Sequence, residues 1–154
     1  MMIKEINKND LKQALDLVND VFSEFVAVDY SEQGKNTFED YLSKKYDEVF
    51  SGLESGHKKM WGYFHDDKII GVIATREFSH IALMFVDKHH HRKGIAKKLF
   101  NIVLEELYEK HDATQITVNS SPYAVTAYEC LGFVKVSEQQ EKDGIVYVPM
   151  KRSL

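Results

Sequence analysis

The sequence has few cysteines and prolines, and it has no long hydrophobic run. It contains 154 residues with one cysteine, Cys130, and two prolines. A lone cysteine excludes an internal disulfide and a zinc site built from several cysteines, and it is typical of a reducing compartment. No apolar run approaches the roughly 20 residues that cross a bilayer, and residues 1–5 lack the pattern of a signal peptide. We therefore expect a cytoplasmic location and no membrane contact.

An excess of positive charge is also missing. The chain has 24 acidic residues against 20 lysines and arginines, which gives a net charge of −4. Domains that bind nucleic acids are usually basic, so we expect no nucleic-acid partner. Hydrophobic residues at 44% and charged residues at 29% are ordinary for a globular protein. No repeat or linker divides the chain, and we expect one domain over residues 1–154.

Hydrophobic periodicity predicts the element order β-α-α-β-β-β-α-β-α-β-β. A strand at residues 2–6 precedes a helix capped by Asn9, and residues 26–37 are irregular before a second helical pattern ends at residues 51–52. The next three strands cover residues 59–65, 68–77 and 79–86, the first two joined at the turn Asp66-Asp67.

The second half of the chain begins with a long helix. Its apolar face runs from Gly94 to about His111, and a strand at residues 114–118 follows. This succession predicts a right-handed parallel crossover in an otherwise antiparallel sheet. A short helix at residues 124–131 and a strand pair at 133–136 and 145–150, around Asp143-Gly144, complete the chain.

Glycine and several cations stand where the third of those strands gives way to the long helix, in Phe-Val-Asp-Lys-His-His-His-Arg-Lys-Gly-Ile-Ala at residues 85–96. The first N–H groups of a helix lack internal acceptors, and the helix dipole is positive there. A pyrophosphate can accept those hydrogen bonds, and Gly94 and Ala96 leave it room. Arg92, Lys93 and Lys97 oppose the dipole by about 0.3–1 kcal/mol each, a conflict that an anionic ligand removes. The alternative is a surface loop in which Gly94 only permits a turn.

Two segments together resemble the GNAT superfamily of N-acetyltransferases. The family's pyrophosphate loop reads Gln or Arg, two residues, Gly, one residue, then Gly or Ala; here His91, Gly94 and Ala96 take those positions. Residues 118–133, Val-Asn-Ser-Ser-Pro-Tyr-Ala-Val-Thr-Ala-Tyr-Glu-Cys-Leu-Gly-Phe, resemble the second motif, in which Asn or Ser precedes Ala and a helix closes on Tyr-Glu-x-Leu-Gly-Phe.

The resemblance implies a GNAT-like fold of the α/β (α+β) class: a mixed, mostly antiparallel central sheet with a parallel β-α-β crossover and helices on both faces. It implies an enzyme that transfers acetyl from acetyl-coenzyme A to a primary amine by direct attack in a ternary complex, as a monomer or homodimer. A small-molecule amine is favoured over a protein. The alternatives are a coenzyme A-binding sensor or pseudoenzyme without turnover, and a structural or interaction domain that has no affinity for coenzyme A.

The resemblance also assigns the coenzyme site to three segments. The strand residues Met84, Phe85 and Val86 meet the pantetheine arm, and the second motif adds Asn119, Ser121 and Ala124. The pyrophosphate loop comprises His91, Arg92, Lys93, Gly94, Ile95, Ala96 and Lys97.

His80 is the candidate base. An alkylamine of pKa ~10.4 is only about one part in 2,500 neutral at pH 7, so a base is useful. His80 precedes Val86 by six residues, where arylalkylamine-type relatives carry an active-site histidine, and strand alternation would put it on the same face as Ala82 and Met84. A hydrogen-bonded histidine at a strand end is the alternative, and Glu77 or a water chain are the other candidate bases.

Tyr128 takes the family's general-acid position, since a phenol of pKa ~10 can protonate a departing thiolate whose conjugate acid lies near ~8.5. A core tyrosine is the alternative. Cys130 has no local base, and we expect a small buried residue. The adjacent residues His89, His90 and His91 are poorly placed to converge on one ion, so we expect no metal.

The acceptor wall is expected from residues 21–37 and 78–80. That part of the chain carries an aromatic and acidic set that would suit a cationic amine, unless its charges are only solvated helix ends: Phe22, Glu24, Phe25, Asp29, Tyr30 and Glu32.

Overall fold

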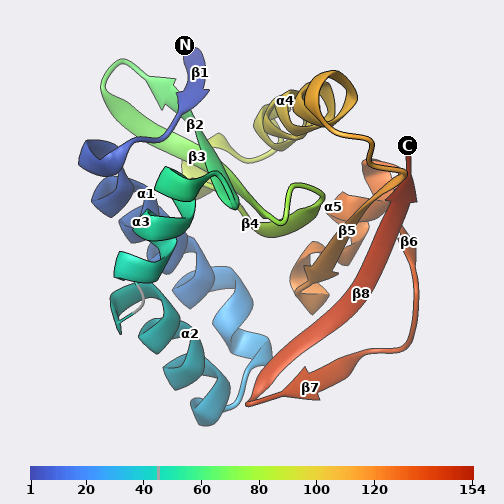
Figure 1. Ribbon diagram of the computed structural model, residues 1–154. Helices are drawn as coiled ribbons and strands as arrows, with labels where there is room; N and C mark the ends of the chain where they lie inside the picture. Colours follow the sequence, from blue (N-terminus) through green and yellow to red (C-terminus); the bar gives the residue numbers. More distant parts are fainter. Residues whose placement is uncertain (45) are drawn as a thin grey trace.

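The structure, a computed structural model, describes residues 1–44 and 46–154, without side-chain detail for residues 43 and 44. One central sheet has the strand order β1-β2-β3-β4-β5-β8-β6, and β7 pairs with β8 (Figure 1). Neighbouring strands are antiparallel except β4 and β5, which are parallel and are joined by α4. The predicted mixed sheet with one parallel crossover is confirmed.

The strands are β1 Met2–Glu5, β2 Lys58–His65, β3 Lys68–Arg76, β4 His80–Val86, β5 Gln115–Ser120, β6 Val134–Lys135, β7 Gln140–Lys142 and β8 Ile145–Ser153. The helices are α1 Lys8–Val21, α2 Glu32–Lys44, α3 Tyr46–Ser55, α4 Ile95–Lys110 and α5 Val125–Cys130. A π-helical turn, Phe22–Val26, extends α1, and 3₁₀ turns lie at Ala27–Asp29, Lys88–His90 and Pro122–Ala124. Among the described residues, no helix is both long and apolar enough to span a membrane.

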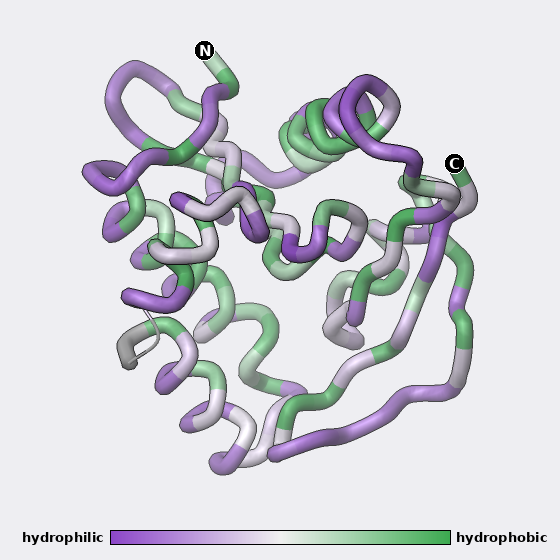
Figure 2. The backbone as a smooth tube through the Cα atoms, in the orientation of Figure 1, coloured by the Kyte–Doolittle hydropathy of each residue, from purple (hydrophilic) through white to green (hydrophobic). Residues whose placement is uncertain are grey.

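Helices cover both faces of the sheet, as predicted. Residues of α1 and α3 pack with β2 and β3 in one hydrophobic core, and α4 and Tyr128 of α5 pack in a second core on the other face. Every residue of β3 between its two ends is buried, which explains why that strand reads as a continuous apolar run. Figure 2 shows the hydrophobic strands between the helices and the hydrophilic β7 at the periphery.

Three details of the helical region differ from the prediction. The N-cap of α1 is Asn7 and not Asn9, because the Asn7 side chain accepts the N–H groups of Asn9 at 2.9 Å and Asp10 at 3.2 Å. Residues 32–37, expected to be irregular, form the start of α2, and the helix expected to end at residues 51–52 is α3, which continues to Ser55. These stretches contain poor helix formers, so the sequence pattern did not predict helices that tertiary packing stabilises. Residue 45, inside the second predicted helix, lies outside the described residues.

The C-terminal strands also differ in part. The turn at Asp143-Gly144 is confirmed, but its first strand is β7 and not the strand predicted at residues 133–136. The strand β6 pairs instead further along β8, with Val134 opposite Lys151. The length of β8 allows both short strands to find a partner, and periodicity alone cannot detect a three-residue strand of polar residues.

The strand β4 contains a bulge at Ala82. Leu83 pairs with Ala74 and Ile81 pairs with Thr75, so Ala82 is an extra residue without a partner on β3. A bulge of this kind interrupts the alternation of side chains along a strand.

The bulge changes the face of the residues that follow it. Ile81, Met84 and Val86 pack toward the α4 side of the sheet, whereas Ala82 and Phe85 pack toward the α1 side. The neighbour of Ile81, His80, therefore faces the α1 side. The prediction that His80 shares a face with Ala82 is consistent with this packing, and the prediction that it shares a face with Met84 is wrong.

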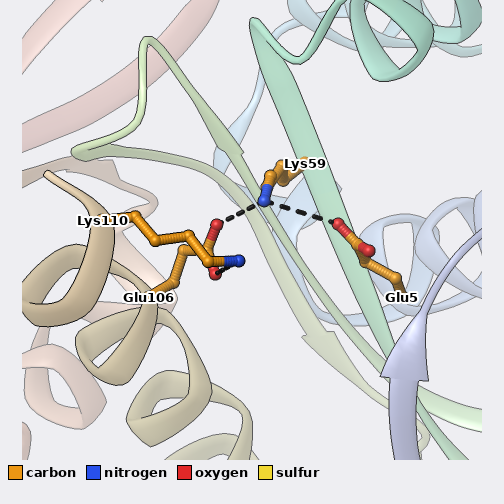
Figure 3. Close-up of polar contacts among 4 residues, drawn as sticks. All are labelled: Glu5, Lys59, Glu106 and Lys110. Atoms are coloured by element: carbon orange, nitrogen blue, oxygen red, sulfur yellow. Dashed lines mark hydrogen bonds and ion pairs between the residues drawn. The ribbon is translucent and has the colours of Figure 1, made fainter.

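A partly buried ion network ties α4 to the edge of the sheet (Figure 3). Lys59 of β2 contacts the Glu106 carboxylate of α4 and lies 3.7 Å from a Glu5 oxygen of β1, and Lys110 lies 3.1 Å from Glu106. Hydrogen bonding to Glu106 is the main cause that raises the pKa of Lys59. Burial alone would raise the pKa of Glu106, but the bonds from both lysines outweigh it and lower that pKa.

Candidate active site

The central feature of the site is an opening between β4 and β5. Their parallel pairing consists of His80 with Thr117 and Ile81 with Val118. Beyond these two pairs, no further residues of β4 and β5 are paired with each other in the described part of the chain. The strand β4 continues beside β3, and β5 continues beside β8. The strands therefore diverge, as Figure 1 shows, and the sheet splits into a β1–β4 half and a β5–β8 half.

One wall of the opening is the second half of β4. The Asp87 N–H donates to the Ile70 carbonyl at 2.8 Å, so by alternation the backbone groups of Phe85 face β3 and those of Met84 and Val86 face the opening. The Val86 carbonyl accepts a hydrogen bond from His91 Nε2 at 2.6 Å. The backbone of Met84 is thus directed into the opening. The backbone of Phe85 faces β3, and its side chain packs toward the α1 side.

The opening leads to the start of α4. Gly94, the N-cap of α4, has φ +75°, and a Cβ placed on it would meet nothing within 4 Å. The Lys98 N–H donates to the Gly94 carbonyl at 3.1 Å as the first helical bond. The N–H groups of residues 95–97 consequently have no helical acceptor. The side chain of Ile95 is buried in the core, so only its N–H can serve a ligand, whereas Ala96 is half-buried at the surface.

The cations around this helix start are exposed. Arg92, with φ +61°, and Lys93 precede Gly94, and Lys97 lies in the first turn. None of the three makes an ion pair within the described part of the chain. Unpaired cations beside free N–H groups attract an anion strongly, so these residues fit a pyrophosphate.

Two of the three adjacent histidines contact Asp87, and the third contacts the Val86 carbonyl. The Asp87 carboxylate accepts the N–H of His89 at 2.9 Å and lies 3.2 Å from His90 Nδ1, while His91 bonds to Val86. Burial works to raise the pKa of Asp87, but these hydrogen bonds lower it. Residues 1–44 and 46–154 contain no group of three or more His, Cys, Asp or Glu side chains that could hold a metal ion.

The other wall of the opening is the segment after β5. Asn119, near the end of β5, lies opposite Pro149 of β8, and its side chain is exposed. The Ser121 carbonyl accepts the Ala124 N–H at 3.1 Å and the Ser120 hydroxyl at 2.8 Å. The bond from Ala124 closes the 3₁₀ turn that leads into α5 and places Ser121 and Ala124 close together, just beyond Asn119 in the chain.

Tyr128 lies in the core beneath this turn. It is 4% exposed, and its ring meets Phe133 edge-on at 5.4 Å. The Tyr128 hydroxyl makes no hydrogen bond with the described residues. Its oxygen is not among the fully buried atoms that lack a partner, so part of the oxygen is accessible. Burial raises the pKa of Tyr128 above its ordinary value of ~10, and the phenol stays protonated at neutral pH.

Cys130 is exposed, so the prediction that it is buried is wrong. Helical residues two apart are rotated by roughly 200°. Since Tyr128 points into the core, Cys130 points away from it.

His80 lies next to the point where the strands separate. Its Nδ1 is 2.8 Å from Thr117 Oγ1 of β5. Burial, and then the charge of Arg76, lower the pKa of His80 to about 4. Glu77, the alternative base, is exposed in the turn before β4 with φ +51°, and its N–H donates to the His57 carbonyl at 2.9 Å.

Aromatic side chains line the α1 side of the opening. The rings of Phe25 and Tyr123 stack with centroids 5.5 Å apart, and Phe25 lies 5.3 Å from the His91 ring. Phe38 stacks on Phe22 at 3.8 Å. The sequence placed aromatic residues at positions 22, 25 and 30, but the role of Tyr123 as the partner across the opening depends on tertiary structure.

Two of the three acidic residues in the predicted acceptor wall form exposed ion pairs with lysines. Glu24 lies 3.2 Å from the Lys88 ammonium, and Glu32 lies 3.3 Å from that of Lys35. The wall is therefore more aromatic than acidic, which the spacing of charges along the sequence did not reveal.

Residues 26–154 match the family model described as the acetyltransferase (GNAT) domain. The chain belongs to the GNAT acetyltransferase family. The family fits the geometry described above, in which an opening in a mostly antiparallel sheet leads to a cationic helix start.

One curated relative matches part of the chain, and two solved N-acetyltransferase structures share its fold. The chain is 26% identical over 102 residues to the UPF0157 protein YqkA of Bacillus subtilis (strain 168), which covers 64% of this chain but only 30% of YqkA. A GCN5-related N-acetyltransferase from Rhodopseudomonas palustris has TM-score 0.79 and 18% identity, with 99% of this chain and 95% of that one covered. The PaiA N-acetyltransferase from Thermoplasma acidophilum, in complex with coenzyme A, has TM-score 0.79 and 17% identity over both full lengths.

The chain thus contains an acetyltransferase domain of the GNAT family, and the acetyl donor of that family is acetyl-coenzyme A. The open N–H groups at the start of α4, the unpaired cations and the space at Gly94 are suited to that donor's pyrophosphate.

Proposed function

We propose that this chain is an N-acetyltransferase that moves an acetyl group from acetyl-coenzyme A to the primary amine of a small molecule, by direct attack in a ternary complex. The observation that carries the proposal is the opening between β4 and β5, which ends at the free N–H groups of α4 beside Arg92, Lys93 and Lys97. Acetyl-coenzyme A supplies an activated thioester. The chain supplies orientation, charge and proton transfer.

The coenzyme is proposed to lie along the opening. The backbone of Met84 would bond to the extended arm, and the N–H groups at the start of α4 would hold the pyrophosphate. His91 acts through its bond to Val86, which shapes the end of β4, and not through a phosphate. Ser121 and Ala124 would border the arm on the β5 side, with Asn119 at its edge.

Two groups on opposite faces are proposed to move the protons. Tyr128 packs in the core on the α4 side, where its protonated hydroxyl would donate to the leaving sulfur. His80 faces the α1 side, where the acceptor amine would approach. This arrangement separates the donor of one proton from the acceptor of the other, with the thioester between them.

The lowered pKa of His80 restricts what it can do. A base of pKa about 4 cannot deprotonate a free alkylammonium of pKa ~10.4 to a useful extent. We propose that the neutral fraction of the amine attacks, and that His80 accepts the proton of the nitrogen as the new C–N bond makes it acidic. For this role Nδ1–H must donate to Thr117, which leaves Nε2 free to accept.

The proposed acceptor is a small amine with an apolar or aromatic part. It would lie against Phe25, Tyr30, Phe38, Phe85 and Tyr123, which are partly buried or exposed aromatic side chains on the α1 side. The pairing of Glu24 and Glu32 with lysines weakens the attraction of the wall for a polyamine, and among the described residues only Asp29 of its three acids lacks an ion pair. An aromatic ring gains contact with such a wall without needing those carboxylates.

A panel of acceptors tests the function. Tyramine, spermidine and a lysine-containing peptide are incubated with acetyl-coenzyme A, and thiol release and the mass of the product are measured. We expect acetylated tyramine to form fastest and the peptide slowest. A rise in melting temperature with coenzyme A but no amine-dependent thiol release would instead indicate the sensor or pseudoenzyme, and no thermal shift would indicate an interaction domain. Four further expectations stay predictions. They are a single domain over residues 1–154, a monomeric or homodimeric state, a cytoplasmic location and the lack of a nucleic-acid partner.

A further inference from the structure

A contact between two glycines joins α2 to the β7–β8 turn. A Cβ placed on Gly34 would lie 2.0 Å from the Gly144 carbonyl oxygen, and a Cβ on Gly144 would lie 2.2 Å from the Gly34 nitrogen. The Thr37 hydroxyl oxygen lies 2.8 Å from the Asp143 carbonyl of the turn and 2.8 Å from the Gln33 carbonyl of its own helix. Neither glycine can carry a side chain here without separating the two elements.

The same helix is anchored to the other half of the sheet. Phe38 of α2 stacks on Phe22 at 3.8 Å and lies 6.4 Å from the Phe85 ring of β4. Figure 1 shows α2 and the β7–β8 turn side by side, away from the point where β4 and β5 pair. Within the sheet, the two halves are joined only by the two described register pairs of β4 and β5. Beside the Phe25–Tyr123 stack, the helix α2 is thus another connection across the opening.

We infer that Gly34, Thr37 and Gly144 are positioning residues for the acceptor: their contact fixes how far the β5–β8 half stands from β4 on the α1 side, and so sets the width of the acceptor site. The inference rests on the proposed function. The start of α4 belongs to the core on the other face of the sheet, where Ile95 is buried. Because the pyrophosphate site at the start of α4 lies away from this contact, loosening the contact is expected to weaken acceptor binding more than coenzyme binding.

The test compares Thr37→Val, which removes the hydroxyl and keeps the shape, with Thr37→Ser, which keeps the hydroxyl. The acceptor KM and kcat are measured with tyramine, or with whichever panel amine is turned over fastest, and coenzyme A binding is measured by thermal shift. We expect Thr37→Val to raise the acceptor KM on the order of 5-fold, with the coenzyme A shift and kcat within about twofold of wild type, and Thr37→Ser to restore the KM.

Gly34→Ala separates the elements more strongly and is expected to raise the acceptor KM by roughly 10-fold or more. Its control is Gly52→Ala in α3, where the three atoms nearest to a Cβ would be side-chain carbons of Lys58. An unchanged acceptor KM in a folded Thr37→Val protein overturns the inference, as does a loss of coenzyme A binding in step with the melting temperature. Absence of turnover by the wild-type protein with every amine removes the proposed function itself, and the inference with it.

Discussion

Burial favours the neutral form of both side chains that are proposed to move protons. It raises the pKa of Tyr128, so the phenol keeps its proton, and it lowers the pKa of His80 to about 4, so the imidazole stays uncharged. The hydroxyl of Tyr128 has no described hydrogen-bond partner, whereas His80 is held by Thr117. Tyr128 is therefore free to donate to a ligand, and His80 is orientated before any ligand arrives.

Removal of the Tyr128 hydroxyl should affect chemistry more than binding. We predict that Tyr128→Phe lowers kcat on the order of 10²-fold through loss of acid catalysis, while the coenzyme A thermal shift stays close to that of wild type. The ring contact with Phe133 is kept in this variant. If kcat is unchanged although the chemical step limits turnover, Tyr128 is a packing residue.

The environment of His80 predicts a pH dependence of stability. In the unfolded chain its pKa is near 6.5, and in the fold it is about 4. Between these values the unfolded chain binds a proton that the folded chain does not, so the free energy of unfolding falls as the pH falls from about 6.5 to 4. We predict that His80→Gln, which cannot titrate, loses this part of the dependence.

The measurement is denaturant unfolding of wild type and His80→Gln at pH 4.5 and pH 7. The unfolding free energy of the variant minus that of wild type should be more positive at pH 4.5 than at pH 7. An identical pH dependence in both proteins would show that His80 titrates near its ordinary value in the fold.

At the scale of elements, local features were predictable and those set by pairing were not. The loop proposed to bind the coenzyme could be predicted from the sequence, because Gly94 and its neighbouring cations belong to the end of one helix. The start of α2 was missed because Gly34 and Thr37 are poor helix formers, which a contact with a distant turn holds in place. The bulge at Ala82 left no signal, since neighbouring residues of β4 are apolar on both faces.

The same distinction applies to the candidate site. His80 and Tyr128 were chosen by position in the sequence, but Thr117, the partner of His80, is known only once β4 and β5 are paired. The stack of Phe25 on Tyr123 joins residues almost a hundred positions apart. Side-chain periodicity describes one element at a time and carries no information on such contacts.

The network around Glu106 gives a prediction at this scale. Because its pKa is lowered in the fold, Glu106 contributes stability above the unfolded value near 4.5 and loses it as the pH falls through the folded value. We predict that Glu106→Gln lowers the free energy of unfolding by about 1–2 kcal/mol at pH 7, and that this deficit shrinks near pH 3.

An exposed ion pair provides the control. Lys12 and Asp16 lie 3.1 Å apart on α1 with side chains 83% and 65% exposed. Such a pair contributes only about 0.3–0.5 kcal/mol, so Asp16→Asn should change stability little. Equal effects of Glu106→Gln and Asp16→Asn would contradict a structural role for the network that joins α4 to the sheet.

At the scale of the whole molecule, the sheet is two halves that share a short parallel contact. The hydrophobic core under α4 contains residues from both halves, while the Phe25–Tyr123 stack and the α2 contact connect them on the other face. This arrangement keeps an opening in the middle of the sheet without a break in the fold. The opening and the helix start at its end together form the proposed coenzyme site.

The most direct test of the central claim is coenzyme A binding by two matched variants. Gly94 has φ +75° and Gly56 has φ +83°, and a Cβ on either would meet nothing within 4 Å. Glutamate at either position therefore has a similar backbone cost and adds the same charge. The melting temperature of wild type, Gly94→Glu and Gly56→Glu is measured with and without excess coenzyme A. We predict a rise for wild type and Gly56→Glu, by mass action, and none for Gly94→Glu, whose carboxylate and bulk would face the pyrophosphate. A normal rise in a folded Gly94→Glu protein would contradict the assignment of this loop to the coenzyme.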